Sequence, residues 1–89
     1  MEFQELPNVG PKLAENLRRA GFDSIESFRA AGAEEAFLRI RTQVDPTACF
    51  HQLTALEGAV QGVRKTQLSQ ERKTELRKFF DGLSGAVSR

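Results

Sequence analysis

Residues 46–63 read PTACFHQLTALEGAVQGV, and the spacing within this stretch decides the fold. Its apolar residues recur at steps of 4, 3, 4 and 3, which is the period of one face of an α-helix. This apolar stripe consists of Cys49, Leu53, Leu56, Val60 and Val63. A second line holds only small residues, which are Ala55, Gly58, Ala59 and Gly62. Glycine inside a helix costs up to about 1 kcal/mol relative to alanine, so we infer that a neighbouring helix approaches closely there.

Two residues before this stripe suit the start of a helix. Asp45 has a side chain that caps helices well, and Pro46 fits the first helical position because its missing N–H would have no partner there. We therefore predict a central helix over 46–63, about 27 Å long.

Four further segments show helical spacing, and no segment alternates apolar and polar residues for long. Pro11 and Gly21 mark the two ends of the first. Asp23 and Glu26 resemble a capping box at the start of the second. We expect these helices over 11–20, from 23 or 24 to Gly32, over 33–43, and from 70 to about 82. The predicted fold class is therefore all-α: a small bundle of about five helices, helix-hairpin-helix or SAM-like, around the central helix 46–63.

The size and charge of the chain fit one small domain. About a quarter of its 89 residues are Leu, Ile, Val or Phe, which is enough for a core. Thirteen basic residues against twelve acidic ones leave a net charge of +1, so any binding to phosphate must come from a local patch. We expect one domain over 1–83 and a frayed tail over 84–89.

The chain has one cysteine and one histidine. Cys49 therefore has no partner for an internal disulfide, and His51 alone cannot form a histidine-rich metal cluster. No apolar run approaches the roughly 18 residues of a membrane span, and the acidic start is not a secretory signal. We expect a cytoplasmic protein with no metal, no cofactor and no small-molecule substrate.

Residues 6–14, LPNVGPKLA, form a tight turn that leads directly into a helix. The first N–H groups of a helix have no internal partner and carry the positive end of its dipole, so a phosphate can bind there. Gly10 permits close approach because it has no side chain, and asparagine tolerates a left-handed backbone at Asn8. The candidate nucleic-acid contacts are Asn8, Gly10, Lys12, Arg18 and Arg19. The alternative is a helix start that only packs its turn against the core.

This turn resembles the helix-hairpin-helix motif of DNA repair and replication proteins. In that motif, a Leu-Pro-Gly-Ile-Gly hairpin grips the DNA backbone without reading sequence. Two departures stand out here. Asn8 replaces the first glycine, and only five residues precede Leu6, so the first helix of the motif is missing or one turn long.

Three stretches together resemble the C-terminal domain of the TfoX (Sxy) family, over most of residues 6–80. They are LPNVGPKLA at 6–14, GAEEAFLR at 32–39, and Cys49 with ALEGAVQG at 55–62. The resemblance implies an all-helical, helix-hairpin-helix-like fold in the bacterial cytosol, with no catalytic residues. Full-length members regulate competence for DNA transformation and carry an α/β domain ahead of this one. We expect this chain to be a free-standing version of the C-terminal domain.

A second candidate site is a secondary basic patch in the last third of the chain. It comprises Arg64, Lys65, Arg72, Lys73, Arg77 and Lys78. A solvated face of an amphipathic helix explains these charges, and so does a contact surface for DNA or an acidic partner protein. Aromatic side chains among them would favour single-stranded nucleic acid. The chain has no Trp or Tyr, and its Phe residues fall at core spacing.

Catalytic chemistry has few candidates. Cys49 and His51 lie two apart on the predicted helix and so point in different directions, which disfavours a nucleophile and base pair. Cys49 is expected in the buried stripe and His51 at the surface. Glu57 is expected to be partly buried and paired with an arginine such as Arg39 or Arg41, holding helices in register, with solvent exposure or a functional role as the alternatives.

Two functions remain open. The leading hypothesis is a non-enzymatic helical module that binds DNA backbone non-specifically through the hairpin over 7–12. The alternative is a protein-interaction or self-association module with no nucleic-acid binding. An enzyme is disfavoured, because the sequence supplies too few titratable groups for a catalytic pocket. No contact with a membrane is expected.

Overall fold

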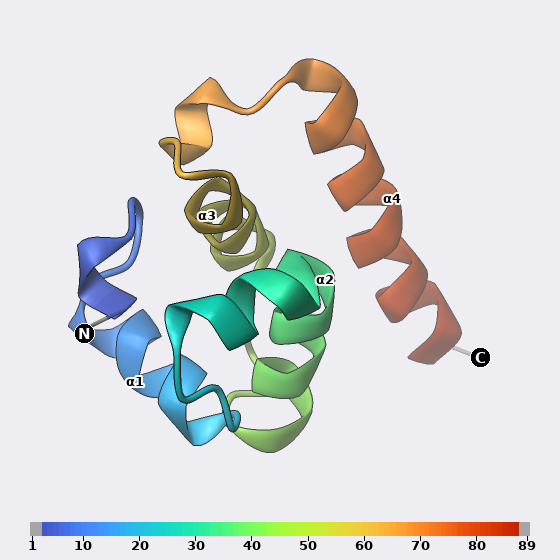
Figure 1. Cartoon of the computed structure of the whole chain (residues 1–89). Helices are drawn as coiled ribbons and strands as arrows, with labels where there is room; N and C mark the ends of the chain where they lie inside the picture. The colour runs from blue at the N-terminus through green and yellow to red at the C-terminus, as the bar shows by residue number, and fades with distance from the viewer. Residues whose placement is uncertain (1–2, 88–89) are drawn as a thin grey trace.

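Helices account for all the regular structure over residues 3–87, which are the residues that this computed structural model describes (Figure 1). Side chains are described over 3–83. The elements are η1 (Phe3–Glu5), α1 (Pro11–Arg19), α2 (Ile25–Gln43), α3 (Phe50–Gln61), η2 (Lys65–Gln67) and α4 (Gln70–Val87), where η marks a 3-10 helix. The all-α prediction is confirmed. None of the helices in this part of the chain is long and apolar enough to cross a membrane.

The two helices predicted on either side of Gly32 form one element, α2, with a kink. Gly32 has φ 88° and ψ 166°, a backbone conformation that other residues rarely adopt. The helix is capped by Ser24, whose side chain accepts a hydrogen bond from the Ser27 amide at 3.0 Å, while the Ser27 hydroxyl accepts one from the Ser24 amide at 3.3 Å. The capping box therefore lies one residue later than the one predicted from Asp23 and Glu26.

The central helix is shorter than predicted, because α3 begins at Phe50 and not at Pro46. The Asp45 carboxylate accepts hydrogen bonds from the amide and hydroxyl of Thr47, at 2.9 and 2.6 Å. These bonds close a turn, so Asp45 caps a turn and not a helix. Cys49 becomes the N-cap and is exposed, which corrects its predicted place in the buried stripe.

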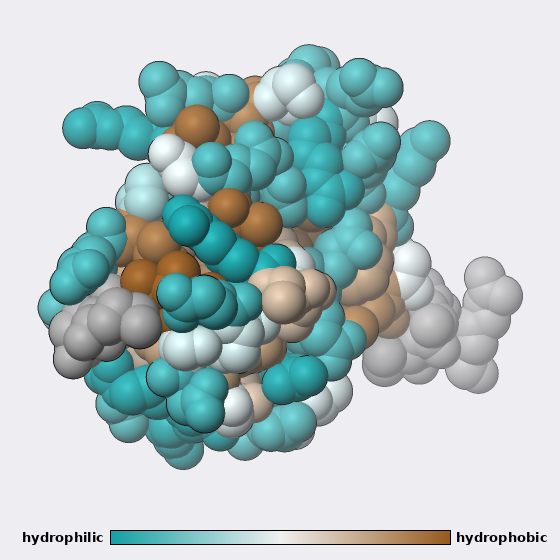
Figure 2. Space-filling model, viewed as in Figure 1, coloured by the Kyte–Doolittle hydropathy of each residue, from teal (hydrophilic) through white to brown (hydrophobic). Residues whose placement is uncertain are grey.

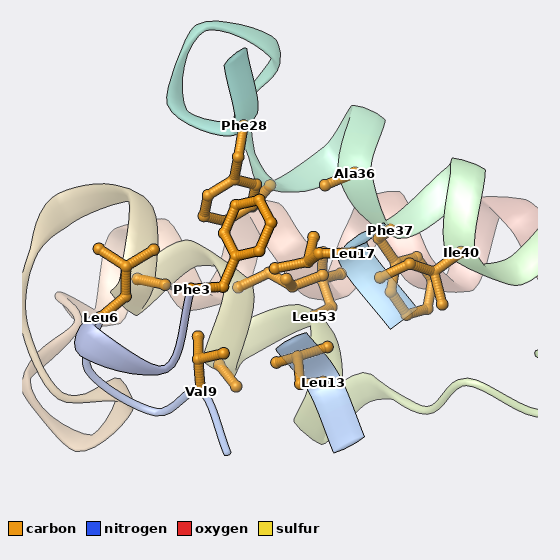
Figure 3. Close-up of a cluster of buried hydrophobic side chains, with 14 of the residues drawn as sticks. Phe3, Leu6, Val9, Leu13, Leu17, Phe28, Ala36, Phe37, Ile40 and Leu53 are labelled. Carbon is orange, nitrogen blue, oxygen red and sulfur yellow. The ribbon is translucent and has the colours of Figure 1, made fainter. Parts of the chain in front are cut away.

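α3 is nonetheless the centre of the fold. All seven residues from Leu53 to Ala59 are buried, so neighbouring segments cover every side of the helix. The helix ends at Gln61, before the predicted end at Val63, and Gly62 caps it with a φ of 79°, in the left-handed region. Figure 3 shows Leu53 among apolar side chains from the N-terminal segment, α1 and α2.

The close neighbour implied by the small-residue stripe is a loop and not a helix. A Cβ atom on Gly58 would collide with the Asn8 side-chain nitrogen and lie 2.6 Å from the Val63 carbonyl oxygen. Glycine is therefore required at this position so that the segment before α1 can contact α3.

α4 packs along α3 and stands at the edge of the molecule (Figure 1). Leu76 is fully buried, and Phe79, Phe80 and Leu83 are partly buried against the core. The helix starts after Ser69, as predicted, and runs to Val87. It therefore continues through 84–87, within the segment expected to fray, while 88 and 89 lie outside the described residues.

Candidate nucleic-acid interface

The hairpin over 7–12 is anchored at both of its sides by buried apolar residues. Leu6 and Val9 are 8% and 7% exposed and point into the core, as Figure 3 shows. The Leu6 amide donates to the Phe3 carbonyl at 2.9 Å, which closes the single turn of η1 ahead of the hairpin. A first helix of one turn matches the expectation from sequence.

Asn8 ties the hairpin to the far end of the central helix. Its backbone has φ 69°, the left-handed conformation expected for it. Its side-chain nitrogen donates to the Val63 carbonyl at 2.9 Å, and its side-chain oxygen accepts from the Lys65 amide at 3.0 Å. Because the nitrogen and the oxygen of its side-chain amide both form hydrogen bonds within the chain, Asn8 positions the hairpin and is not available to bind a ligand. The sequence gives no sign of this contact, which joins residues 57 apart.

Gly10 and Lys12 are placed differently, because both are exposed. The Gly10 carbonyl accepts the Ala14 amide at 3.0 Å and so begins α1. No acceptor in the described part of the chain hydrogen-bonds with the amide of Gly10 or of Lys12. The start of the nine-residue helix α1 therefore presents two N–H groups to solvent, as the phosphate hypothesis requires.

Arg18 and Arg19 lie at the other end of α1, both exposed. Arg18 pairs with Glu15 across 3.3 Å. Lys12 and Arg19 lie two helical turns apart on one face, about 10 Å along the axis. The two ends of α1 are thus too far apart for a single phosphate, and a continuous backbone would be needed to contact both.

Lys12 shares its surroundings with an acidic group. Hydrogen bonds from the Thr47 side chain and amide lower the pKa of Asp45, and the nearby charge of Lys12 lowers it further. Asp45 and Glu15 therefore offset part of the positive charge at the start of α1.

The structure divides the secondary basic patch into three parts. Arg64 and Lys65 lie beside the hairpin, since the Lys65 amide donates to Asn8. Both side chains are exposed and have no acidic partner over residues 3–83. Arg72 is engaged with carboxylates, and the α4 basic group of Lys73, Arg77 and Lys78 lies further along that helix. Arg64 and Lys65 thus join the hairpin, an association that the sequence does not reveal.

Residues 1–80 match the model of the TfoX C-terminal domain. The chain belongs to the TfoX C-terminal domain family. It is 31% identical over 82 residues to Protein Sxy of Escherichia coli strain K12. The matched stretch covers 92% of this chain and 39% of Sxy. The chain therefore spans about two fifths of the curated relative that it matches.

Two crystal structures from Listeria monocytogenes share the fold of this TfoX C-terminal domain. An uncharacterized protein in a triclinic form superposes with a TM-score of 0.91 at 42% identity, covering 96% of both chains. A protein of unknown function in a tetragonal form gives a TM-score of 0.86 at 44% identity, covering 90% of this chain and 98% of that one.

Glu57 of this TfoX C-terminal domain is buried and pairs with Arg72, not with Arg39 or Arg41. Its carboxylate accepts from Arg72 at 3.0 Å and from Gln61 at 2.6 Å. Burial by itself raises the pKa of Glu57, but the hydrogen bonds from Arg72 and Gln61 hold it below its ordinary value. The bond to Glu57 in turn raises the pKa of Arg72.

Arg72 therefore joins three segments and is not available to a ligand. Besides Glu57 on α3, it pairs with Glu34 on α2 across 3.4 Å and with Glu75 on α4 across 2.9 Å. The role expected for Glu57, holding helices in register, is confirmed with a different arginine.

Cys49 and His51 stand apart from any reactive arrangement in the described chain. Both are exposed at the start of α3. Over residues 3–87, no group of three or more His, Cys, Asp and Glu side chains could hold a metal ion.

Proposed function

We propose that this chain is a non-enzymatic helical module that binds the backbone of duplex DNA without reading its sequence. The contact is made by the hairpin over 7–12. The observation that carries the proposal is the pair of unengaged amides at Gly10 and Lys12, on a turn that the rest of the fold holds in place.

Preorganisation supports this assignment. Leu6 and Val9 are buried and Asn8 is bonded to the end of α3, so the turn has little freedom to lose on binding. The amides of Gly10 and Lys12 lie at the positive end of the α1 dipole, where an anion is stabilised. A phosphate group presents negative oxygens that accept hydrogen bonds from such donors.

The charged residues around the hairpin determine how tightly we expect DNA to bind. Lys12, Arg64 and Lys65 add positive charge at the hairpin, whereas Glu15 and Asp45 reduce it. Binding through about three phosphates gives a slope of about −2.7 in a plot of log affinity against log salt. We therefore expect weak binding that is lost at high salt.

Membership of the TfoX C-terminal domain family and the likeness to Sxy support a role as a competence-regulator-like module. In such a role, this domain would supply attachment to DNA without sequence preference.

Fluorescence anisotropy with a labelled duplex tests the proposal at about 50 mM and about 200 mM salt. Lys12→Glu should weaken binding at low salt. Lys78→Glu makes the same change of charge on the exposed surface of α4, which lies across α3 from the hairpin, and should leave duplex binding nearly unchanged. Absence of binding at low salt, or equal losses in the two variants, would overturn the proposal.

Protein interaction is the second candidate function, and it draws on α4. Phe79 and Leu83 stay partly exposed on that helix. On the face shown in Figure 2, however, apolar surface appears in separate areas divided by hydrophilic side chains, whereas a large contiguous patch is typical of a docking site. Light scattering separates the candidates, because a self-associating module would show a mass above 9.9 kDa.

A further inference from the structure

A pocket of about 380 Å³ lies where the start of α3 meets α4. It is lined by Phe50, Gln70, Lys73, Thr74, Arg77 and Lys78. Its size falls within the range of small-ligand sites in proteins. In Figure 1, α4 lies on the opposite side of α3 from the hairpin, so this pocket is separate from the site discussed above.

The lining of the pocket is strongly positive. Three of its six residues are basic and none is acidic. Lys73 and Lys78 have no ion pair with any described residue, and Arg77 has only a surface pair with Asp81, at 3.3 Å. A ligand for this pocket must therefore carry negative charge.

Phe50 gives the pocket an aromatic wall. The guanidinium of Arg77 lies 4.9 Å from the centre of the Phe50 ring. The Phe80 ring packs edge-on against the Phe50 ring, with ring centres 5.6 Å apart. Phe80 is in turn held by Phe37, with ring centres 5.9 Å apart. These contacts orient the Phe50 ring, which is half-buried and borders the pocket. In the sequence, Phe50 falls at core spacing, so its position beside basic residues of α4 could not be predicted.

We propose that this pocket binds single-stranded nucleic acid, with one unpaired base stacked on Phe50 and the adjoining phosphates held by Lys73 and Lys78. An aromatic wall beside basic side chains is the combination that single-strand binding proteins use, because every base has a face that stacks. Bases in a duplex are already stacked and paired, so a duplex does not satisfy this pocket. This pocket and the hairpin have no residue in common.

The unmodified chain provides the first test. Anisotropy compares a labelled thymidine oligonucleotide with an abasic strand of equal length and charge. Stacking of one base predicts that the abasic strand binds about 5- to 150-fold more weakly. Equal affinity for the two strands would overturn the proposal, and so would equal affinity for polyglutamate of the same charge, which would indicate a site for acidic protein.

A tryptophan reporter gives the second test. The chain has no Trp or Tyr, so Phe50→Trp places a single indole in the pocket wall. A stacked base should quench its fluorescence, and the abasic strand should not. If the oligonucleotide binds and the indole signal is unchanged, the base does not stack at residue 50.

Matched variants separate the two sites. Lys73→Gln should weaken binding of the single strand and leave binding of duplex DNA by the hairpin intact. Lys12→Glu should do the reverse. If Lys12→Glu abolishes both, the hairpin is the only nucleic-acid site and the pocket proposal is wrong.

Discussion

The side chain of Asn8 donates a hydrogen bond to the carbonyl oxygen of Val63 at 2.9 Å, which joins the hairpin to the end of the central helix. The same side chain accepts from the Lys65 amide at 3.0 Å. One residue thereby sets the position of the free amides before α1 and brings Arg64 and Lys65 beside them.

Replacing Asn8 tests how much these bonds contribute. Asn8→Gly keeps the left-handed backbone and removes the hydrogen bonds of the side chain, so we expect a loss of about 1–3 kcal/mol in the free energy of unfolding. Asn8→Ala should cost about 1 kcal/mol more, because alanine disfavours φ 69°. Urea denaturation measures both. If Asn8→Ala is as stable as the original chain, the hairpin is not held by this side chain.

Gly58 should resist substitution even though alanine is the better helix former. A Cβ atom there collides with the Asn8 side chain and the Val63 carbonyl, so Gly58→Ala should destabilise the fold by about 1–3 kcal/mol. Gly82→Ala is the control, since nothing lies within 4 Å of a Cβ at that position of α4. It should stabilise the fold by up to about 1 kcal/mol. The same sign for both variants in a thermal melt would contradict this packing.

The Glu57–Arg72 pair makes stability depend on pH. The pKa of Glu57 is lowered in the folded protein, so its contribution is present above the ordinary value of 4.5 and is lost as the pH falls through the folded value. Glu57→Gln should reduce the free energy of unfolding by about 1–3 kcal/mol at neutral pH. The difference in free energy of unfolding between Glu57→Gln and the original chain should become smaller in urea titrations below pH 4.5. A gap that is constant with pH would mean that the charge of Glu57 contributes nothing.

Asn16 is the one asparagine in the core, at 1% exposure, and both polar atoms of its side chain lack a hydrogen-bond partner among the described residues. Burying an unsatisfied amide is unfavourable. Asn16→Leu should therefore raise the free energy of unfolding by about 1–2 kcal/mol, as measured by urea denaturation. A loss of stability would show that the amide is satisfied in solution.

Helix ends that depend only on neighbouring residues could largely be predicted from the sequence. Pro11 begins α1 and Gly21 adopts a positive φ after its end, both as expected, whereas Gly62, expected inside the central helix, is left-handed and ends it. The start of α3 was mispredicted because aspartate favours a helix cap and a tight turn alike, and the hydroxyl of Thr47 tips Asp45 toward the turn.

Contacts between distant segments could not be predicted in this way. Nothing near Glu57 in the sequence singles out Arg72 over the nearer arginines, because the choice depends on how α4 folds back along α3. The same holds for Asn8, whose side chain bonds to Val63 and Lys65, both more than fifty residues away. The glycine and lysine of the candidate interface can be singled out from the sequence, whereas its support by Asn8 and the nearby Lys65 are visible only in the fold.

The most direct test of hairpin binding observes its amides. In a two-dimensional ¹H–¹⁵N NMR titration with duplex DNA at low salt, we predict that the Gly10 and Lys12 signals shift first, together with that of Lys65. Signals that stay unchanged at Gly10 and Lys12 while the DNA binds would contradict the proposal that these amides hold the phosphate.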